Sequence, residues 1–167
     1  MVDWHCATAY ARWSAAKTGL PWRVPREWEW EKSARGVGGR WCPWGDHADS
    51  SWCRIRDSQH GRPLPVSVET YPLDASVYGV RGMGGNVRDW CADVFAKDGS
   101  GLAGGRVAPP ASFDEPHVSE GARRVHRGGH WHGSRLHARC AFRWANAASD
   151  RSAILGIRLL RSFPSAR

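Results

Sequence analysis

Four histidines lie close together in the last third of the chain. They are half of the eight histidines in the 167 residues, and they fall within twelve positions: His126, His130, His132 and His137. Imidazole nitrogens are good ligands for zinc, copper and iron. Residues two apart point to the same side of a strand, so His130 and His132 could share one such ion.

Two other interpretations of this stretch stay open. No carboxylate or thiol stands at a fixed spacing from the two histidines, so His130 and His132 also fit a pair of solvated side chains around Trp131. A serine-histidine-aspartate triad can be composed from Ser134, His130 and a distant aspartate. Such sets arise by chance in a chain with eight histidines.

The five cysteines favour buried thiols over a disulfide framework. Their number is odd, and no two of them form a Cys-x-x-Cys pair. Free cysteine behaves as a small apolar side chain and is commonly buried. Cys91 lies inside a motif described next, and Cys140 lies in Arg-Cys-Ala-Phe-Arg at residues 139–143, so we expect both in the core.

Several motifs follow one another in a fixed order. Residues 23–36 read Arg-Val-Pro-Arg-Glu-Trp-Glu-Trp-Glu-Lys-Ser-Ala-Arg-Gly, and residues 43–46 read Pro-Trp-Gly-Asp. Residues 85–93 read Gly-Asn-Val-Arg-Asp-Trp-Cys-Ala-Asp. Residues 124–133 read Arg-Val-His-Arg-Gly-Gly-His-Trp-His-Gly, and Gly-Ile-Arg-Leu follows at 156–159.

Together these motifs resemble the formylglycine-generating (sulfatase-modifying-factor) family over residues 2–161. The family has Arg-Leu-Pro-Thr-Glu-x-Glu-Trp-Glu-x-Ala-Ala-Arg-Gly for the first motif and Gly-Asn-Val-Trp-Glu-Trp-Cys-Ala-Asp for the third. This chain therefore carries Arg88 where the family has tryptophan and Asp89 where it has glutamate.

The resemblance implies a C-type-lectin-like fold of α+β class, rich in loops, which we assign to residues 1–167 as a single domain. The family's domain usually has one or two more strands and a loop before the segment that matches Val2, so this version is N-terminally shortened. Early and late strands pair in that fold, and loss of an early strand exposes the edge of a late one. We expect a partner chain or a missing N-terminal segment to cover that edge.

The family's oxidation chemistry is not expected in this chain. Formylglycine formation, as the resemblance implies, needs two cysteines in the loop after Gly-Gly-Ser, whose soft thiolates bind copper(I). Residues 130–136 contain no thiol, and Gly133 takes the position of the first cysteine. The second position falls at Arg135 or within a deletion. Cys140 matches a third, non-catalytic cysteine of the family.

The resemblance also implies a calcium site in the third motif. Gly82, Gly85, Val87 and Asp89 fall at the family's ligand positions, with Gly82 in place of an asparagine. Backbone carbonyls beside a carboxylate suit this hard cation. The alternative is a structural turn in which Asn86 and Asp89 bond to the backbone.

The wider family includes ergothioneine sulfoxide synthases, pyoverdine-maturation proteins and proteins that use the fold only as a binding scaffold. We therefore expect a module that binds a peptide, a protein or a small molecule on the face formed by residues 128–146. Its ligand-binding residues would be Trp131, Arg135, His137, Arg143, Trp144 and Asn146. The alternative is a metal-dependent oxidoreductase that uses His130 and His132 with copper or iron, so whether the chain is an enzyme stays open.

The first helix is predicted to begin after Asp3, which can cap it, and to end at Gly19. Cys6, Tyr10 and Trp13 recur at helical spacing as one apolar stripe. We expect that stripe to face the core.

The second helix is predicted to begin at Pro25 and to end at Gly36. Trp28 and Trp30 lie on different faces of it, so that one can be core and the other can take part in an interface. Short strands are expected within residues 123–161, a strand near 66–71, and irregular loops over 36–65 and 99–116.

Charge and hydropathy limit the classes of partner and the cellular location that we expect. The net charge of +8 comes mostly from scattered arginines, which can stack on the 11 tryptophans. Nucleic acid is thus an improbable partner, since phosphate contacts need clustered basic residues. No apolar stretch approaches the roughly 18 residues of a membrane span, and the start lacks the features of a signal peptide. These patterns predict a cytoplasmic protein without a membrane segment.

Overall fold

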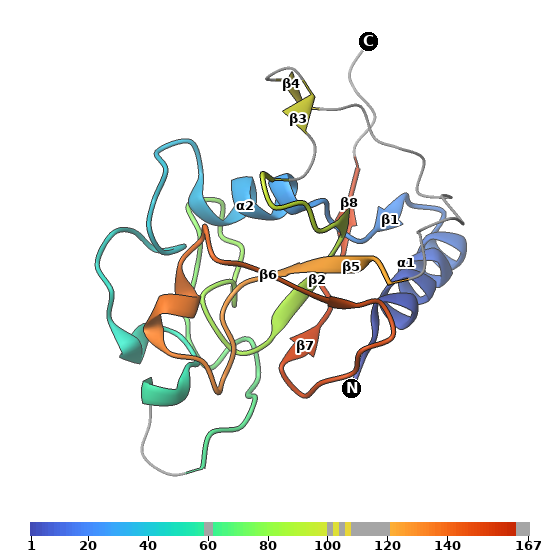
Figure 1. Cartoon of the computed structure of the whole chain (residues 1–167). Helices are drawn as coiled ribbons and strands as arrows, with labels where there is room; N and C mark the ends of the chain where they lie inside the picture. The colour runs from blue at the N-terminus through green and yellow to red at the C-terminus, as the bar shows by residue number, and fades with distance from the viewer. Residues whose placement is uncertain (59–61, 100–101, 104–105, 108–120, 163–167) are drawn as a thin grey trace.

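The computed structural model describes residues 1–58, 62–99, 102–103, 106–107 and 121–162. Helices and strands are joined by long irregular segments (Figure 1). The helices are α1 (Trp4–Thr18) and α2 (Glu27–Arg35), with short 3₁₀-helices η1 (Ser50–Trp52), η2 (Arg56–Ser58) and η3 (Arg135–Ala138). The strands are β1 (Trp22–Arg23), β2 (Arg88–Val94), β3 (Leu102–Ala103), β4 (Arg106–Val107), β5 (Arg123–Arg127), β6 (Arg143–Ala147), β7 (Leu155–Gly156) and β8 (Leu160–Arg161). The α+β, loop-rich prediction is confirmed.

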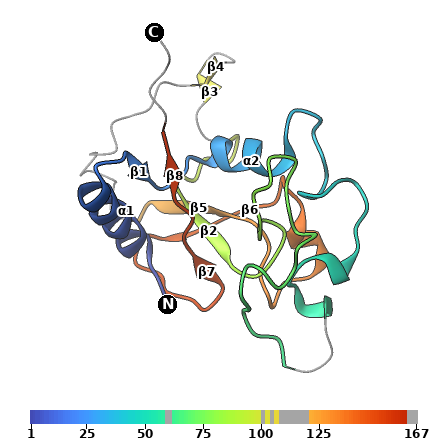
Figure 2. The ribbon, with the colours of Figure 1, turned by 180° about the vertical axis from the view of Figure 1, so that it is seen from behind.

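The central sheet has the strand order β6-β5-β2-β7. Strand β5 pairs antiparallel with both β2 and β6, whereas β7 pairs parallel with β2. Figures 1 and 2 show α2 along one side of this sheet, α1 at the end near β1, and the irregular segment that follows α2 at the opposite end. Most residues of β2 and β5 are buried, and both strands carry buried polar side chains that are described below.

The caps of α1 form as predicted. The Asp3 carboxylate accepts a hydrogen bond from the backbone N–H of Cys6 at 2.7 Å, and Gly19 ends the helix in the left-handed region at φ 68°. The apolar stripe, by contrast, is wrong. Tyr10 and Trp13 remain 48% and 53% exposed and stack on each other, and Cys6 is exposed too.

The helix instead buries its small side chains. Ala7 and Ala11 face the core and pack with Val24, Trp90 and Leu155. Alanine allows the helix backbone to approach the sheet closely, which bulky aromatic side chains would prevent. Helical periodicity correctly placed Tyr10 and Trp13 on one face of α1, but that face is not the one that packs on the core.

The two tryptophans of α2 divide as predicted. Trp30 is buried and donates from Nε1 to the Asp89 carboxylate at 2.9 Å, while Trp28 is exposed. Cys91 and Cys140 lie in the same core cluster as Trp30, so their predicted burial is confirmed. All five cysteines are free.

A buried ion-pair network joins α2 to the sheet. The guanidinium of Arg127, fully buried on β5, lies 3.1 Å from Glu27 and 2.5 Å from Glu31. Arg143 on β6 pairs with the same Glu27. Arg127 also donates to the carbonyl of Cys140 at 2.7 Å. Three carboxylate contacts thus hold two basic residues of the sheet against one helix.

The prediction of a strand near 66–71 is wrong. The backbone there bonds to a side chain, that of Asn86, where a strand would bond to a neighbouring strand. Asn86 accepts from the N–H of Val66 and donates to its carbonyl, both at 2.9 Å. Most of the predicted loop at 99–116 lies outside the described residues. Within the described part of the chain, no helix is long and apolar enough to cross a membrane.

Strand β8 is the late strand whose edge was expected to be exposed. It pairs antiparallel with β1, Trp22 opposite Arg161 and Arg23 opposite Leu160. Among the residues that the structure describes, β1 is its one strand partner. What covers the other edge stays a prediction.

Candidate functional site

The predicted ligand face begins where β5 ends, at a close crossing of two backbones. A Cβ atom on Gly129 would stand 2.1 Å from the carbonyl oxygen of Gly84, so residue 129 must be glycine for the segments to pass. The next bond after the crossing joins the N–H of Trp131 to the carbonyl of Asn86 at 2.8 Å. The residues that follow are therefore fixed in position relative to β2.

His130 and His132 do not lie on a strand, which corrects the prediction that they point to the same side. Residues 130–133 form a turn that is closed by a bond of 2.8 Å from the N–H of Gly133 to the carbonyl of His130. His130 is 9% exposed, whereas His132 is exposed to solvent. The ring that does meet His130 is that of His137 on η3, with centroids 5.3 Å apart.

Burial keeps the histidines beneath this turn neutral. Desolvation lowers the pKa of His130 to about 3 and that of His126 to about 4, and Arg88 lowers both further. The pKa of His137 is also lowered, first by burial and then by Arg88. Nδ1 of His130 is buried and has no hydrogen-bond partner among the described residues.

Arg88 is a residue of this site that was not predicted from the sequence. It is 3% exposed on β2, its Nη1 lies 3.5 Å from Nδ1 of His126, and its guanidinium stands 4.7 Å from the centre of the Phe142 ring. Burial lowers its pKa to about 10, so it stays charged at neutral pH. Its position in the third motif, where the family has tryptophan, was the available signal.

The alternation of β5 and β6 decides which predicted ligand residues reach the face. His126 is opposite Trp144 and Arg127 is opposite Arg143, and opposite residues of an antiparallel pair share a side. The second pair points to α2 and its carboxylates, so Arg143 is not on the ligand face. Trp144 is exposed on the other side, stacked parallel to Phe142 at 6.4 Å.

The remaining predicted ligand residues take different roles. Oδ1 of Asn146 accepts from Nε2 of His126 at 2.8 Å, and its Nδ2 donates to Asp150, so Asn146 supports the site from beneath. Trp131 is half-buried and donates from Nε1 to the carbonyl of Ala153. Arg135 is exposed at the start of η3. The structure brings Arg135, His137 and Trp144 to one region and leaves Arg143 and Asn146 in supporting positions.

Two of the four predicted calcium positions, Gly82 and Asp89, are in contact with a guanidinium. Nε of Arg158 lies 2.7 Å from Oδ2 of Asp89, and its Nη2 lies 3.0 Å from the carbonyl of Arg81 and 3.4 Å from that of Gly82. Oδ2 of Asp89 also accepts from Trp30. These side chains do not fit a calcium ion at Asp89 unless Arg158 moves away. Calcium at Gly82, Gly85, Val87 and Asp89 stays a prediction.

The donors do not fit a copper or iron ion either. Among the described residues there is no group of three or more histidine, cysteine or acidic side chains placed to hold a metal. Cys140 follows the loop, but burial raises the pKa of its thiol to about 12, so it remains protonated. A metal site on His130 and His132 stays a prediction without a matching set of ligands.

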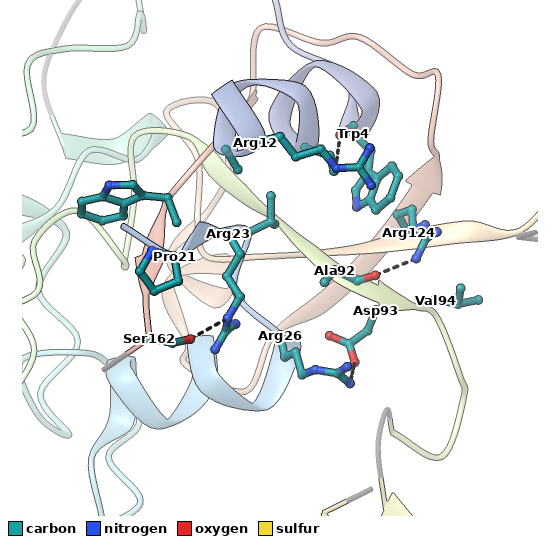
Figure 3. Close-up of a pocket in the computed structure, with 14 residues that line it drawn as sticks. Trp4, Arg12, Pro21, Arg23, Arg26, Ala92, Asp93, Val94, Arg124 and Ser162 are labelled. Carbon is teal, nitrogen blue, oxygen red and sulfur yellow. Dashed lines mark hydrogen bonds and ion pairs between the residues drawn. The ribbon is translucent and has the colours of Figure 1, made fainter. Parts of the chain in front are cut away.

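A separate cavity of about 530 Å³ lies beside α1, β1 and β2, and Arg124 of β5 and Ser162 also line it (Figure 3). Its walls are apolar where Trp4, Trp22 and Val24 contribute, and its polar lining is mainly arginine: Arg12, Arg23, Arg26 and Arg124. No sequence pattern predicts this cavity, because five segments that are distant in sequence contribute its walls.

The charges around this cavity are held by neighbours. Arg23 forms a two-pronged pair with Glu29 and donates to Ser162. Arg124 donates to the carbonyl of Ala92 at 2.6 Å and stacks over Trp4. The cavity is thus a polar-rimmed apolar hollow whose arginines already have partners.

Comparison with known proteins gives consistent results. The model of the sulfatase-modifying factor enzyme 1-like domain matches residues 1–163. The chain is 33% identical over 172 residues to the formylglycine-generating enzyme of Streptomyces coelicolor, covering 94% of this chain and 50% of that protein. It is 32% identical over 159 residues to the serine/threonine-protein kinase Pkn1 of Chlamydia trachomatis (94% and 23%), and 32% identical over 166 residues to the hercynine oxygenase of Mycolicibacterium thermoresistibile (95% and 34%).

Solved structures agree on the fold. PvdO from Pseudomonas aeruginosa superposes with a TM-score of 0.76 at 24% identity, covering 97% of this chain and 60% of that one. Treponema denticola variable protein 1 superposes with a TM-score of 0.71 at 20% identity, covering 95% and 68%. The chain spans half or less of the length of the three curated relatives named above.

Proposed function

The chain belongs to the sulfatase-modifying factor enzyme 1-like family, and from that premise we propose that it is a ligand-binding member rather than a copper-dependent oxidase. The observation that carries the proposal is the loop after Gly129. It offers histidine, serine and arginine side chains but no thiol, and the cysteine that follows it, Cys140, is buried in the core.

The exposed part of this region suits a peptide or protein surface. Within the face predicted at residues 128–146, we restrict the name ligand face to five side chains around η3 and the start of β6: His132, Arg135, Leu136, Phe142 and Trp144. Four of them are exposed and Phe142 is half-buried. Aromatic and arginine side chains supply large contact areas and directional polar contacts, and they are enriched where binding energy concentrates.

The base of the ligand face is rigid, which favours binding. The crossing of Gly129 over Gly84 fixes where the loop starts, and the ion pairs of Arg127 fix the strand before it. Side chains that are already held in place lose less conformational entropy when a ligand binds. A fixed base with exposed side chains above it suits a recognition surface.

The rival function is a metal-dependent oxidoreductase. One observation favours it, the similarity to hercynine oxygenase over 95% of this chain. Nδ1 of His130 would be the available donor, since it is buried and has no partner among the described residues. This function requires ligands from outside the described arrangement, because His132 points into solvent.

Peptide display followed by calorimetry tests the proposal. We expect wild type to enrich related peptides whose binding is lost in a triple variant, Arg135→Ala, Leu136→Ala and Trp144→Ala. The matched control is Tyr10→Ala with Trp13→Ala, which removes an equally exposed aromatic pair on α1 and should keep the binding.

Metal analysis by mass spectrometry separates the rival. The protein is purified without a histidine tag and offered copper(I), iron(II) and calcium in turn. Near-stoichiometric copper or iron that disappears in His130→Ala with His132→Ala, together with no peptide enrichment, would replace the binding proposal with the oxidoreductase. Retention of peptide binding by the triple variant would also contradict the ligand face.

A further inference from the structure

We infer that Arg88 recognises an oxyanion of the ligand, a carboxylate, sulfate or phosphate group, bound beside His126, His130 and His137. This inference rests on the proposed function, because it names the chemistry of a ligand for the same region of the molecule. It concerns a residue beneath the ligand face rather than one on it.

The first argument is the unbalanced charge of Arg88. It is 3% exposed, and it forms no ion pair with any carboxylate among the described residues. Its contacts are an imidazole nitrogen at 3.5 Å and the face of the Phe142 ring. Buried charges in proteins are normally paired, because removing a lone ion from water is costly.

Other arginines of this chain have oxygen partners. The buried Arg127 binds two carboxylates and a carbonyl, and the half-buried Arg158 binds Asp89 and two carbonyls. Arg54, which also has no carboxylate partner in the described part of the chain, donates to the carbonyl of Leu64 at 2.8 Å. Each of these cations has at least one protein oxygen as acceptor, and Arg88 has only a weakly placed nitrogen.

The second argument is the set of unused donors around Arg88. Nε of Arg88 and Nδ1 of His130 are both buried without a partner among the described residues. The Phe142 ring that Arg88 contacts lies 4.7 Å from the His137 ring, which in turn lies 5.3 Å from the His130 ring. The N–H of His126 is already donated to Asn146, whereas His137 accepts at Nδ1 from the N–H of Ser134 and keeps the N–H of Nε2 to donate. Neutral His130 can also donate one N–H, and a guanidinium can hold an oxyanion with two parallel bonds.

The third argument is that no neighbouring acid competes with an anion for Arg88. Phe142 and the three histidines are uncharged at neutral pH, and no nearby acid affects the pKa of Arg88. An oxyanion here would therefore meet one positive charge without a negative one. The half-buried Phe142 ring contacts the guanidinium, and the half-buried His137 ring lies 4.7 Å from the Phe142 ring. The oxyanion would reach Arg88 from the ligand face past these two rings.

The test uses sodium sulfate, inorganic phosphate and acetate as probes, each balanced against chloride at equal ionic strength. The histidine ring signals are followed by NMR in wild type, Arg88→Met and Arg88→Lys, with Arg62→Met as the control for an exposed arginine outside the ligand face. We expect a saturable shift of the His130 and His137 signals with at least one probe. The shift should vanish in Arg88→Met, weaken in Arg88→Lys and persist in Arg62→Met.

Thermal unfolding without added oxyanion provides the second readout. Arg88→Met should melt at the same temperature as wild type or higher, because it removes an unbalanced buried charge while it keeps most of the side-chain volume. A clear loss of stability would indicate a structural cation and overturn the inference. So would shifts that are unchanged in Arg88→Met, or no saturable shift with any of the three probes.

Failure of this inference is distinguishable from failure of the proposed function. If Arg88→Met binds the selected peptides as tightly as wild type, the oxyanion site is wrong and the ligand face stands. If the oxyanion shifts depend on Arg88 but no peptide is enriched, the ligand face is wrong as a peptide surface and the oxyanion site stands.

Discussion

Arg158 and Asp89, 69 positions apart in sequence, form an ion pair with Nε and Oδ2 2.7 Å apart. The same guanidinium donates to the carbonyls of Arg81 and Gly82. A side-chain cation thus stands among the oxygens that the family resemblance assigns to a metal cation. The pairing also connects β2 to the segment between β7 and β8.

Calcium should therefore have little effect on wild type. We expect no rise in the melting temperature at about 1 mM calcium, the weak end of protein calcium sites. Arg158→Gln, which vacates the carboxylate but keeps a polar side chain, should melt lower and gain a calcium response. Calorimetry with calcium, magnesium and a chelator measures both effects. A calcium-dependent rise in wild type that the chelator reverses would show that Arg158 yields to the ion.

Gly129→Ala should be strongly destabilising. Its Cβ would stand 2.1 Å from the carbonyl oxygen of Gly84, so one backbone must move. We expect a loss of about 3 kcal/mol in the free energy of unfolding, the upper end of overpacking effects. Gly38→Ala is the control, since its Cβ meets nothing within 4 Å. Urea unfolding measures the difference, and equal stabilities of the two variants would contradict the close crossing.

Arg127→Met should cost far more stability than an equivalent change at the surface. It leaves the buried carboxylate of Glu27 with one partner fewer, and breaking a buried pair costs about 3 kcal/mol or more. The matched change is Arg56→Met, which breaks the exposed pair with Asp57 and should cost at most about 1 kcal/mol. Chemical denaturation of both variants under one set of conditions gives the comparison. Similar costs would refute the structural role of the network.

Stability should fall in mild acid because of the buried histidines. In the unfolded chain a histidine has a pKa near 6.5, and in the folded protein the pKa drops to about 4 for His126 and about 3 for His130. Below 6.5 the unfolded state binds more protons, so the free energy of unfolding decreases as the pH falls toward the folded values. Above pH 6.5 these histidines are neutral in both the folded and the unfolded state, so the free energy of unfolding keeps its full value.

The variant His130→Gln isolates one share of that effect. Its stability should fall less than that of wild type between about pH 7 and about pH 5, whereas His132→Gln should follow wild type because His132 is exposed. Urea unfolding at several pH values supplies the slopes. Identical slopes for all three proteins would mean that His130 titrates normally.

Sequence patterns were reliable where a local rule decides the structure. Asp3 and Gly19 bound α1 because capping is a property of a few neighbouring residues. Trp28 and Trp30 separate because two positions along a helix turn the side chain to another face. The motif cysteines Cys91 and Cys140 are buried as predicted, since both occur in strongly apolar surroundings.

The same patterns failed where segments that are distant in sequence determine the structure. The stripe of Tyr10 and Trp13 is exposed because the sheet accepts only the alanine face of α1. His130 and His132 diverge because the crossing at Gly129 ends the strand before them. Arg88 was not predicted as a site residue, since its role depends on which side chains from β5, η3 and the η3–β6 connection meet it.

The alternation of β5 and β6 separates two kinds of constraint. Arg127 and Arg143 face α2, while His126 and Trp144 face the opposite side. Mutational effects on the two sides should then be nearly additive, because the groups share no partner. Specificity could be redesigned at alternate positions of β6 without loss of the ion pairs that maintain the fold, which makes this strand a practical starting point for engineering new recognition.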